Sequence, residues 1–251
     1  DAAMYYANYH THTCFCDGRD TPEQLVQESI RLGCPTLGFS GHSYAFYDAA
    51  CMPKENIRPY QAEIRRLQSA YSGQIRILLG IEQEYYSDEP TEAYDYVIGA
   101  VHNLRHGSEY RSVDHTRERL IAIVDDWFGG DWYAMVEEYY RLVGDLYEKT
   151  HCRVIAHFDL IEKFNEAGEL FDRTHPRYRA AALAALEDEA KYGAVLRAKG
   201  IVAASEGEWI HFDYTPGEQN IRKGPADYTG RLCVIGSKLV DEKLASLFGV
   251  A

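Results

Sequence analysis

The strongest constraint on the fold is the alternation of apolar, strand-like segments with amphipathic, helix-like segments along most of the 251 residues. We expect strands at residues 5–10, 34–42, 75–85, 94–104, 152–160, 200–207 and 231–237. Helices are expected at residues 21–32, 57–71, 118–127, 132–150, 175–199 and 241–248. Because crossovers make such strands parallel, the pattern predicts an α/β fold, either closed into a barrel or laid out as an open sheet. No Gly/Ser-rich linker or repeat interrupts the chain, so we expect a single domain.

The charge balance excludes several classes of partner. A net charge of −13, from 39 acidic and 26 basic residues, argues against binding to nucleic acid or to an anionic membrane by bulk attraction. A small anionic substrate would need local positive charge, which bound divalent cations can supply. We also expect neither a membrane span nor a signal peptide, since no apolar run of about 18 residues and no charged-then-apolar leader occurs.

Cysteine usage favours a reducing compartment. The six cysteines contain no C-x-x-C pair, so we interpret them as reduced thiols of a cytoplasmic protein. Cys14 and Cys16 form a C-x-C pair that could hold zinc through thiolates, although the neighbouring histidines and carboxylates suit a harder nitrogen and oxygen site better.

The segment "NYHTHTCFCDG" carries the first candidate ligands. His10 and His12 are two residues apart, and side chains alternate along a strand, so both imidazoles point to the same face and can bind one metal ion. The alternative is a pair of hydrogen-bonded histidines at a strand end. Asp17 precedes Gly18 in a dipeptide that is common in turns, so its role stays open between ligand and turn residue.

Further polar residues follow apolar strands along the chain. Glu82 comes directly after a buried run, where an unpaired carboxylate is costly unless a positive charge neutralises it. Glu84 lies on the same face and either shares that role or reaches solvent. The other strand ends carry His42, His102 and His157. Each of these could be a structural histidine alone, but together they indicate a metal site at the C-terminal edge of parallel strands.

The donor set exceeds what one zinc ion needs. Five imidazoles and at least two carboxylates imply two or three divalent metal ions, and imidazole with carboxylate suits Zn, Fe or Mn. Motifs of nucleophilic or nucleotide chemistry are absent from the sequence: it has no G-x-S-x-G elbow, Walker loop or G-x-G-x-x-G.

Five ordered motifs then identify a family resemblance. "HTHTCFCDG", "FSGHS", "GIEQEY", "GAVHNL" and "AHFDLIEKFN" occur in this order between residues 10 and 165, and the resemblance they carry extends over about residues 4–180. In these motifs the chain resembles the PHP-domain phosphoesterases, and within them the histidinol-phosphatase branch. The resemblance implies a distorted (β/α)7, TIM-like barrel with a trinuclear metal site at the C-terminal strand ends. It also implies a domain spanning residues 1–251, with an atypical part from about 195.

The resemblance also implies the role of each matched residue. His10 and His12 would bind the first metal, Glu82 would bridge the first and second, His102 and His157 would complete the second, and Asp17 and His42 would hold the third. Hydrolysis of a phosphomonoester by a metal-bound hydroxide, with no protein nucleophile, is the implied reaction. Lys163 is a candidate phosphate contact, with a solvated surface lysine as the alternative; Arg19, Arg105 and His106 are weaker candidates.

The chain departs from the family near its C-terminal end. The family has a late S-D-x-H motif, but "VIGSKLVDEKL" places Lys238 at the Asp position and Val240 at the His position. His211 and Asp213 are candidate substitutes for these two missing ligands, and Asp241 is a third.

Three hypotheses follow. The first is hydrolysis of L-histidinol phosphate to L-histidinol and phosphate in histidine biosynthesis. The second is hydrolysis of another small phosphate ester, since a fold does not fix the leaving group. The third is a degenerate PHP domain with weak or no activity.

Overall fold

The computed structural model describes residues 7–152, 154–165, 168–186, 194–203, 209–215, 218–224 and 231–237, with side chains up to Ala185. The chain divides into two compact units, and each is described by itself. The first comprises Asp1–Asp131 with Asp145–Ile161, and the second comprises Trp132–Gly144 with Glu162–Ala251.

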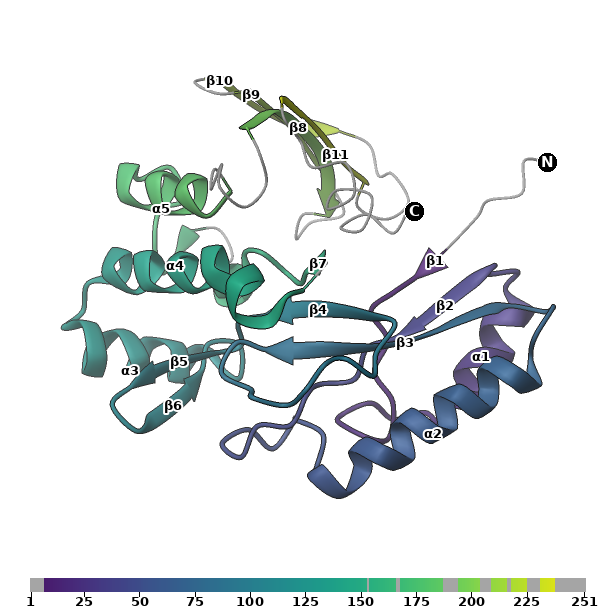
Figure 1. The fold of residues 1–251 in the computed structure, drawn as a ribbon. Helices are drawn as coiled ribbons and strands as arrows, with labels where there is room; N and C mark the ends of the chain where they lie inside the picture. The colour runs from purple at the N-terminus through teal and green to yellow at the C-terminus, as the bar shows by residue number, and fades with distance from the viewer. Residues whose placement is uncertain are drawn as a thin grey trace. The chain divides into compact units, whose positions relative to one another are not determined.

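The first unit is built on a sheet of five parallel strands in the order β1-β2-β3-β4-β7 (Figure 1). The strands are β1 (Ala7–Asn8), β2 (Thr36–Phe39), β3 (Arg76–Glu84), β4 (Tyr96–Ala100) and β7 (Val154–Ile155). Spatial order follows chain order, so all five C-terminal ends lie along one edge of the sheet. The predicted α/β fold with parallel strands is confirmed for this unit.

Two helices cover one part of this sheet. Helix α1 (Pro22–Arg31) begins at the N-cap Thr21, whose side chain forms a capping box with Gln24, and helix α2 (Lys54–Ala70) packs against β3. Their buried side chains are Pro22 and Val26 in α1 and Tyr60, Ile64 and Leu67 in α2. These apolar faces pack on the sheet, α1 against β2 and α2 against β3.

The expected strand at 94–104 is wrong in its second half. Strand β4 ends at Ala100, and β5 (Asn103–His106) starts an antiparallel hairpin with β6 (Glu109–Ser112). Gly107 has a φ of +61°, a conformation that glycine adopts without a steric penalty and that allows the tight turn. Helix α3 (Arg117–Phe128) follows, capped by Thr116, and α4 (Trp132–Thr150) has the predicted bounds.

The second unit contains the first part of α4, the 3-10 helix η1 (Leu160–Phe164) from residue 162, and helix α5 (Pro176–Leu186). The prediction of one helix over 175–199 is wrong, because α5 ends at Leu186 and residues 194–203 form a strand. The Ala-rich run favours helix locally, but residues 194–203 pair with other strands instead. Asn165 is buried in this unit, and its side chain forms hydrogen bonds with the backbone of Leu170 and Phe171.

A four-stranded antiparallel sheet, β10-β9-β8-β11, forms the rest of the described second unit. Its strands are β8 (Ala194–Ala203), β9 (Trp209–Thr215), β10 (Glu218–Gly224) and β11 (Arg231–Ser237). A strand at 231–237 is confirmed, but its antiparallel pairing differs from the parallel strands expected. The expected helix at 241–248 lies outside the described residues. None of the described helices combines the length and apolarity that a membrane crossing requires.

Candidate metal centre

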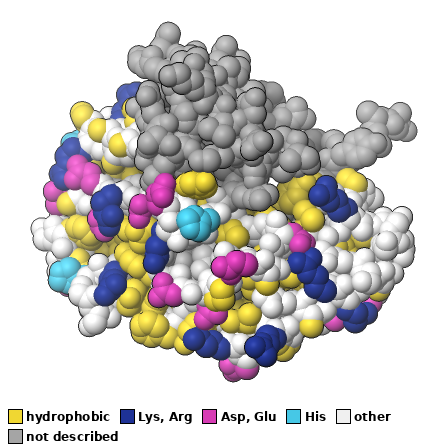
Figure 2. Space-filling view, in the orientation of Figure 1, with side chains coloured by type: hydrophobic (Ala, Val, Ile, Leu, Met, Phe, Trp, Pro, Cys, Tyr) yellow, Lys and Arg dark blue, Asp and Glu magenta, His cyan; other side chains and the backbone are white. Residues whose placement is uncertain are grey.

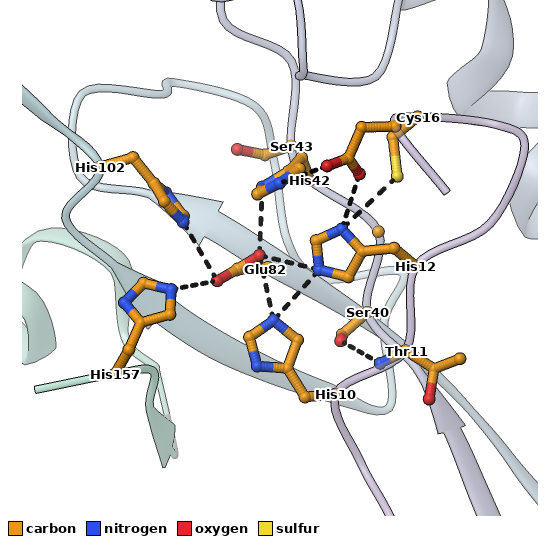
Figure 3. Close-up of polar contacts among 12 residues, drawn as sticks. His10, Thr11, His12, Cys16, Ser40, His42, Ser43, Glu82, His102 and His157 are labelled. Atoms are coloured by element: carbon orange, nitrogen blue, oxygen red, sulfur yellow. Dashed lines mark hydrogen bonds and ion pairs between the residues drawn. The ribbon is translucent and has the colours of Figure 1, made fainter. Parts of the chain in front are cut away.

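Glu82 is the centre of the site. Its carboxylate is 1% exposed and faces five imidazoles that come from four other strand ends (Figure 3). Oε2 lies 3.1 Å from a ring nitrogen of each of His10, His12 and His42. Oε1 lies 3.1 Å from Nε2 of His157 and 3.5 Å from Nε2 of His102. The structure therefore gathers every strand-end histidine singled out in the sequence around one carboxylate.

The sheet topology explains this gathering. Glu82 is in β3, the middle strand, and pairs in register with Ile98 of β4 and, through an isolated bridge, with His42 beyond β2. His10 and His12 follow β1, and His102 and His157 follow β4 and β7. Since parallel strands end at the same edge, ligands distant in sequence become neighbours in space.

The donor geometry fits a shared cation. Oε2 of Glu82 is buried and has no partner in hydrogen-bonding geometry, although three imidazole nitrogens lie 3.1 Å away. His10 and His12 also bring their Nε2 atoms within 3.1 Å of each other. A buried carboxylate oxygen without a hydrogen-bond partner is costly unless a positive charge lies beside it. Two groups of donor atoms lie close enough to hold an ion at this carboxylate: His10, His12 and Glu82, and His42, Glu82 and His102.

Asp17 lies on the far side of His12 from Glu82. Its Oδ1 is 2.8 Å from Nδ1 of His12, and its Oδ2 is 3.6 Å from Nε2 of His42. Gly18 holds this turn closely, because its N–H donates to the carbonyl of Thr13 at 3.1 Å and an added Cβ would lie 2.5 Å from the Thr13 nitrogen. Asp17 is thus placed at the site by a tight turn, as a turn residue that also contacts two histidines.

Charge coupling shifts the ionisation of the cluster. Burial opposes protonation of His12, but its contacts with Cys16, Glu82 and Asp17 raise its pKa to about 11. Burial likewise opposes protonation of His42, whose pKa Asp17 and Glu82 raise to about 10. The imidazoles overcome the burial of Glu82 and hold its pKa far below the usual range. Without metal, protons on histidine neutralise the carboxylates, and a metal ion would replace them.

Glu84 is buried, not solvated. It is 1% exposed, and its Oε2 lies 2.8 Å from Nδ1 of His102 and accepts a hydrogen bond from the His102 backbone N–H at 3.1 Å. The sequence left both alternatives open, although the alternation of side chains places Glu84 on the face of Glu82; the burial of Glu84 in the structure decides between them.

Cys16 belongs to the same surroundings, while Cys14 is exposed. The Cys16 Sγ lies 3.9 Å from Nδ1 of His12, and these two atoms form a third donor group with Asp17. Although burial opposes it, the contact with His12 lowers the pKa of the Cys16 thiol.

Comparison with known proteins identifies the family. A family model described as "PHP domain" matches residues 8–192. The chain belongs to the PHP domain family. The match contains all of the PHP site residues named around Glu82 and ends close to the point, about residue 195, where the sequence departs from the family pattern.

Two relatives of this PHP chain carry the name histidinol-phosphatase. The histidinol-phosphatase of Bacillus subtilis is 31% identical over 183 residues, which cover 62% of this chain and 66% of the relative. The "Probable histidinol-phosphatase" of Schizosaccharomyces pombe is 29% identical over 185 residues, covering 64% of this chain and 59% of the relative. The matched segments thus span less than two thirds of the relatives' own length.

A solved structure supports the PHP fold. The crystal structure of a candidate histidinol phosphatase from Listeria monocytogenes superposes with a TM-score of 0.58 at 18% identity. It covers 73% of this chain and 80% of the other. At this identity the likeness establishes the α/β PHP fold and nothing finer.

The candidate phosphate contacts lie on two elements. Arg105 is exposed in the β5–β6 hairpin, where its Nε donates to the carbonyl of Gly107 at 2.7 Å and its guanidinium lies over the ring of Tyr110. Lys163 lies in η1, with its ammonium over the ring of Phe164. Their roles in binding phosphate stay predictions.

The weaker candidates are also on the surface of the first unit. Arg19 is exposed next to the tight turn, and His106 stacks on the ring of Trp127. Figure 2 shows Lys and Arg side chains interspersed with Asp and Glu on the visible described face, without an extended area of one sign. Attraction of an anion on this face would therefore depend on local charge at a site.

The candidate substitutes for the late ligands are placed only in part. His211 and Asp213 lie in β9, and nothing of their side chains is described. Lys238, Val240 and Asp241 lie outside the described residues. Their relation to the metal centre stays a prediction.

Proposed function

We propose that the chain is a metal-dependent phosphomonoesterase whose substrate is L-histidinol phosphate, hydrolysed to L-histidinol and phosphate in histidine biosynthesis. The observation that carries the proposal is the buried Glu82 carboxylate with five imidazole nitrogens within 3.5 Å. The relatives named histidinol-phosphatase, in a PHP family, favour this substrate.

The donors suit two or three divalent ions of Zn, Fe or Mn. His10 and His12 would hold the first ion with Glu82, and His102 and His157 the second, while Asp17 and His42 would hold the third. Bound divalent ions neutralise phosphate oxygens and lower the pKa of a water that attacks phosphorus. This local charge offsets the repulsion expected from a protein of net charge −13.

The protein's own part is to position the ester and hold the ligands rigid. Lys163 and Arg105 would bind phosphate oxygens, since both side chains are cationic and lie on segments that follow ligand-bearing strand ends. For Arg105 this requires exchanging its bond to the Gly107 carbonyl for a bond to phosphate. The predicted compartment is the cytoplasm, in keeping with the five described cysteines being free thiols.

Two alternatives to this function predict different results for phosphate release. Another small phosphate ester could be the substrate, because the metal site does not fix the leaving group. A degenerate PHP domain with weak or no activity is favoured by one observation, the "SKLV" segment with Lys238 and Val240 at two ligand positions. Substitution by His211 and Asp213 would restore the ligand count.

The test measures phosphate release from L-histidinol phosphate and from a panel of other monoesters, by protein reconstituted with Zn, Mn or Fe and with its metal content determined. Turnover of L-histidinol phosphate above the panel is expected. Turnover confined to other esters would leave the phosphatase and change its substrate. Full metal content without turnover of any ester would reject both and leave the degenerate domain.

A further inference from the structure

We propose that Glu84 is a positioning residue that fixes the ring of His102 so that Nε2, not Nδ1, faces the metal centre. This inference rests on the proposed function, because it names a determinant of metal binding at the same site. None of the family motifs used above assigns a role to this carboxylate.

The contacts of His102 carry the argument. One ring nitrogen, Nδ1, lies 2.8 Å from Oε2 of Glu84, while the other, Nε2, points to Oε1 of Glu82 at 3.5 Å. An ionised carboxylate only accepts hydrogen bonds, so Nδ1 carries a proton in this contact and Nε2 is the ring nitrogen left to bind a metal ion. The same Oε2 atom also accepts the His102 backbone N–H, which fixes the residue at both ends.

Glu84 is itself held rigidly. Its backbone N–H donates to Oγ of Ser43 at 3.0 Å, and it pairs in register with Ala100 of β4, two residues before His102. With 1% of its surface exposed, the side chain has no solvent to turn toward. A carboxylate so fixed selects the tautomer and limits the rotation of the imidazole that it contacts.

A role as a direct ligand is less well supported. Among the described residues, none of the groups of donor atoms close enough to hold an ion contains Glu84, whereas two of them contain Glu82. Oε2 of Glu84 accepts hydrogen bonds from the backbone and the ring of one residue, His102. The carboxylate therefore acts through His102.

The experiment compares Glu84→Met, which removes the acceptor at similar length, with Glu84→Gln, which keeps an acceptor oxygen but no charge. Zinc affinity of the full chain is measured by competition with a chelator, and folding is checked by circular dichroism. We expect Glu84→Met to weaken zinc binding by about 10- to 100-fold, the range typical for the loss of such outer partners. Glu84→Gln should lie between Glu84→Met and the unaltered protein.

A matched control comes from the neighbouring residue. Gln83 is also buried in β3, and its side chain donates to the carbonyls of Ser87 and Glu89 on the other face of the strand. Gln83→Met should lower the melting temperature without weakening zinc binding. A merely structural role for Glu84 would make the two Met variants alike in both measurements.

A spectroscopic measurement reports the ring directly. In the zinc-loaded protein, nitrogen-15 NMR of the histidine side chains should show a His102 Nδ1 proton protected from exchange, with zinc on Nε2. Glu84→Met should lose that protected proton, and Glu84→Gln should keep it. Unchanged zinc affinity and an unchanged His102 signal in Glu84→Met would overturn the positioning role while leaving the metal site intact. Failure of the unaltered protein to bind metal would overturn the proposed function with it.

Discussion

Replacing Gly18 by alanine should damage the metal centre from outside it. The residue lies in the turn between His12 and the first helix, and an added Cβ would lie 2.5 Å from the nitrogen of Thr13 and 2.6 Å from the carbonyl carbon of His12. Both neighbours are backbone atoms, so no side chain can rotate out of the way. The turn itself, which carries Asp17, must move.

The size of the movement follows from these distances. Ordinary van der Waals contact for a Cβ begins at 3.4 Å, so the segment must separate from Thr13 by about 0.9 Å (3.4 − 2.5). Functional constellations tolerate errors of about 0.5 Å. A misplacement of about 1 Å can cost about 100-fold in activity. We therefore expect Gly18→Ala to lower phosphate release by about 100-fold and to weaken zinc binding, because the contact between Asp17 and Nδ1 of His12 is 2.8 Å long and cannot survive such a shift.

The assay pairs zinc affinity with initial rates on the substrate identified by the monoester panel. Gly33→Ala is the control: its φ of +74° makes alanine strained, but no heavy atom lies within 4 Å of the added Cβ. That variant should lose stability, by about 1 kcal/mol or somewhat more, and keep its zinc affinity. Wild-type zinc affinity and rate in Gly18→Ala would refute the argument that this turn sets the site.

Three further predictions concern the cluster and its frame. His102→Ala should abolish phosphate release and lower metal content, whereas His175→Ala, which removes a ring stacked on Tyr133, should keep both; retention of metal and activity in His102→Ala would mean that the site is misplaced. In the metal-free protein the raised pKa values of His12 and His42 stabilise the fold fully below about pH 6.5, the ordinary histidine value, and this contribution declines as pH rises toward 10 and 11. The cluster carboxylates, with lowered pKa values, contribute only above their ordinary pKa of about 4, so the melting temperature should peak near pH 5 to 6.5. The gain from added zinc should instead grow from about pH 6 to 8, because ligating imidazoles must be neutral, and a zinc effect that shrinks over this interval in thermal scans would contradict the scheme. Tyr96→Phe should lower the free energy of unfolding, measured in urea, by about 1–3 kcal/mol and leave zinc affinity unchanged, because the Tyr96 hydroxyl donates to the Tyr9 carbonyl at 2.6 Å inside the sheet. A loss of zinc affinity without a loss of stability would contradict this prediction.

The gathering of the strand-end histidines around Glu82 was predictable from sequence because it depends on the parallel direction of the strands. His10, His42 and His102 each follow an apolar strand, and parallel strands joined by crossovers must end at one edge. The structure places these three histidines around Glu82, as the positions of the strand ends in the sequence predict. The role of Asp17 as a ligand depends on where an ion binds, and it therefore stays a prediction.

The parts that sequence reasoning missed depend on tertiary pairing. A continuous apolar run suggested one strand over 94–104, but the backbone leaves the sheet after Ala100 and pairs again as a hairpin. The Ala-rich run after Pro176 indicated a helix as far as 199, yet residues from Ala194 pair with β9 and β11. In these two segments local propensity does not distinguish the predicted structure from the observed one, and pairing with other strands decides between them.

The dispersal of the Glu82 contacts along the chain has a consequence for biosynthesis. The carboxylate draws on partners from His10 to His157, so the last imidazole leaves the ribosome only after most of the parallel sheet has been made. Contacts of such long sequence separation form late in folding. A metal ion therefore cannot guide the early steps of folding by binding to a complete site. A nascent chain arrested before residue 157 would present only four of the five histidines and would bind metal more weakly and less selectively.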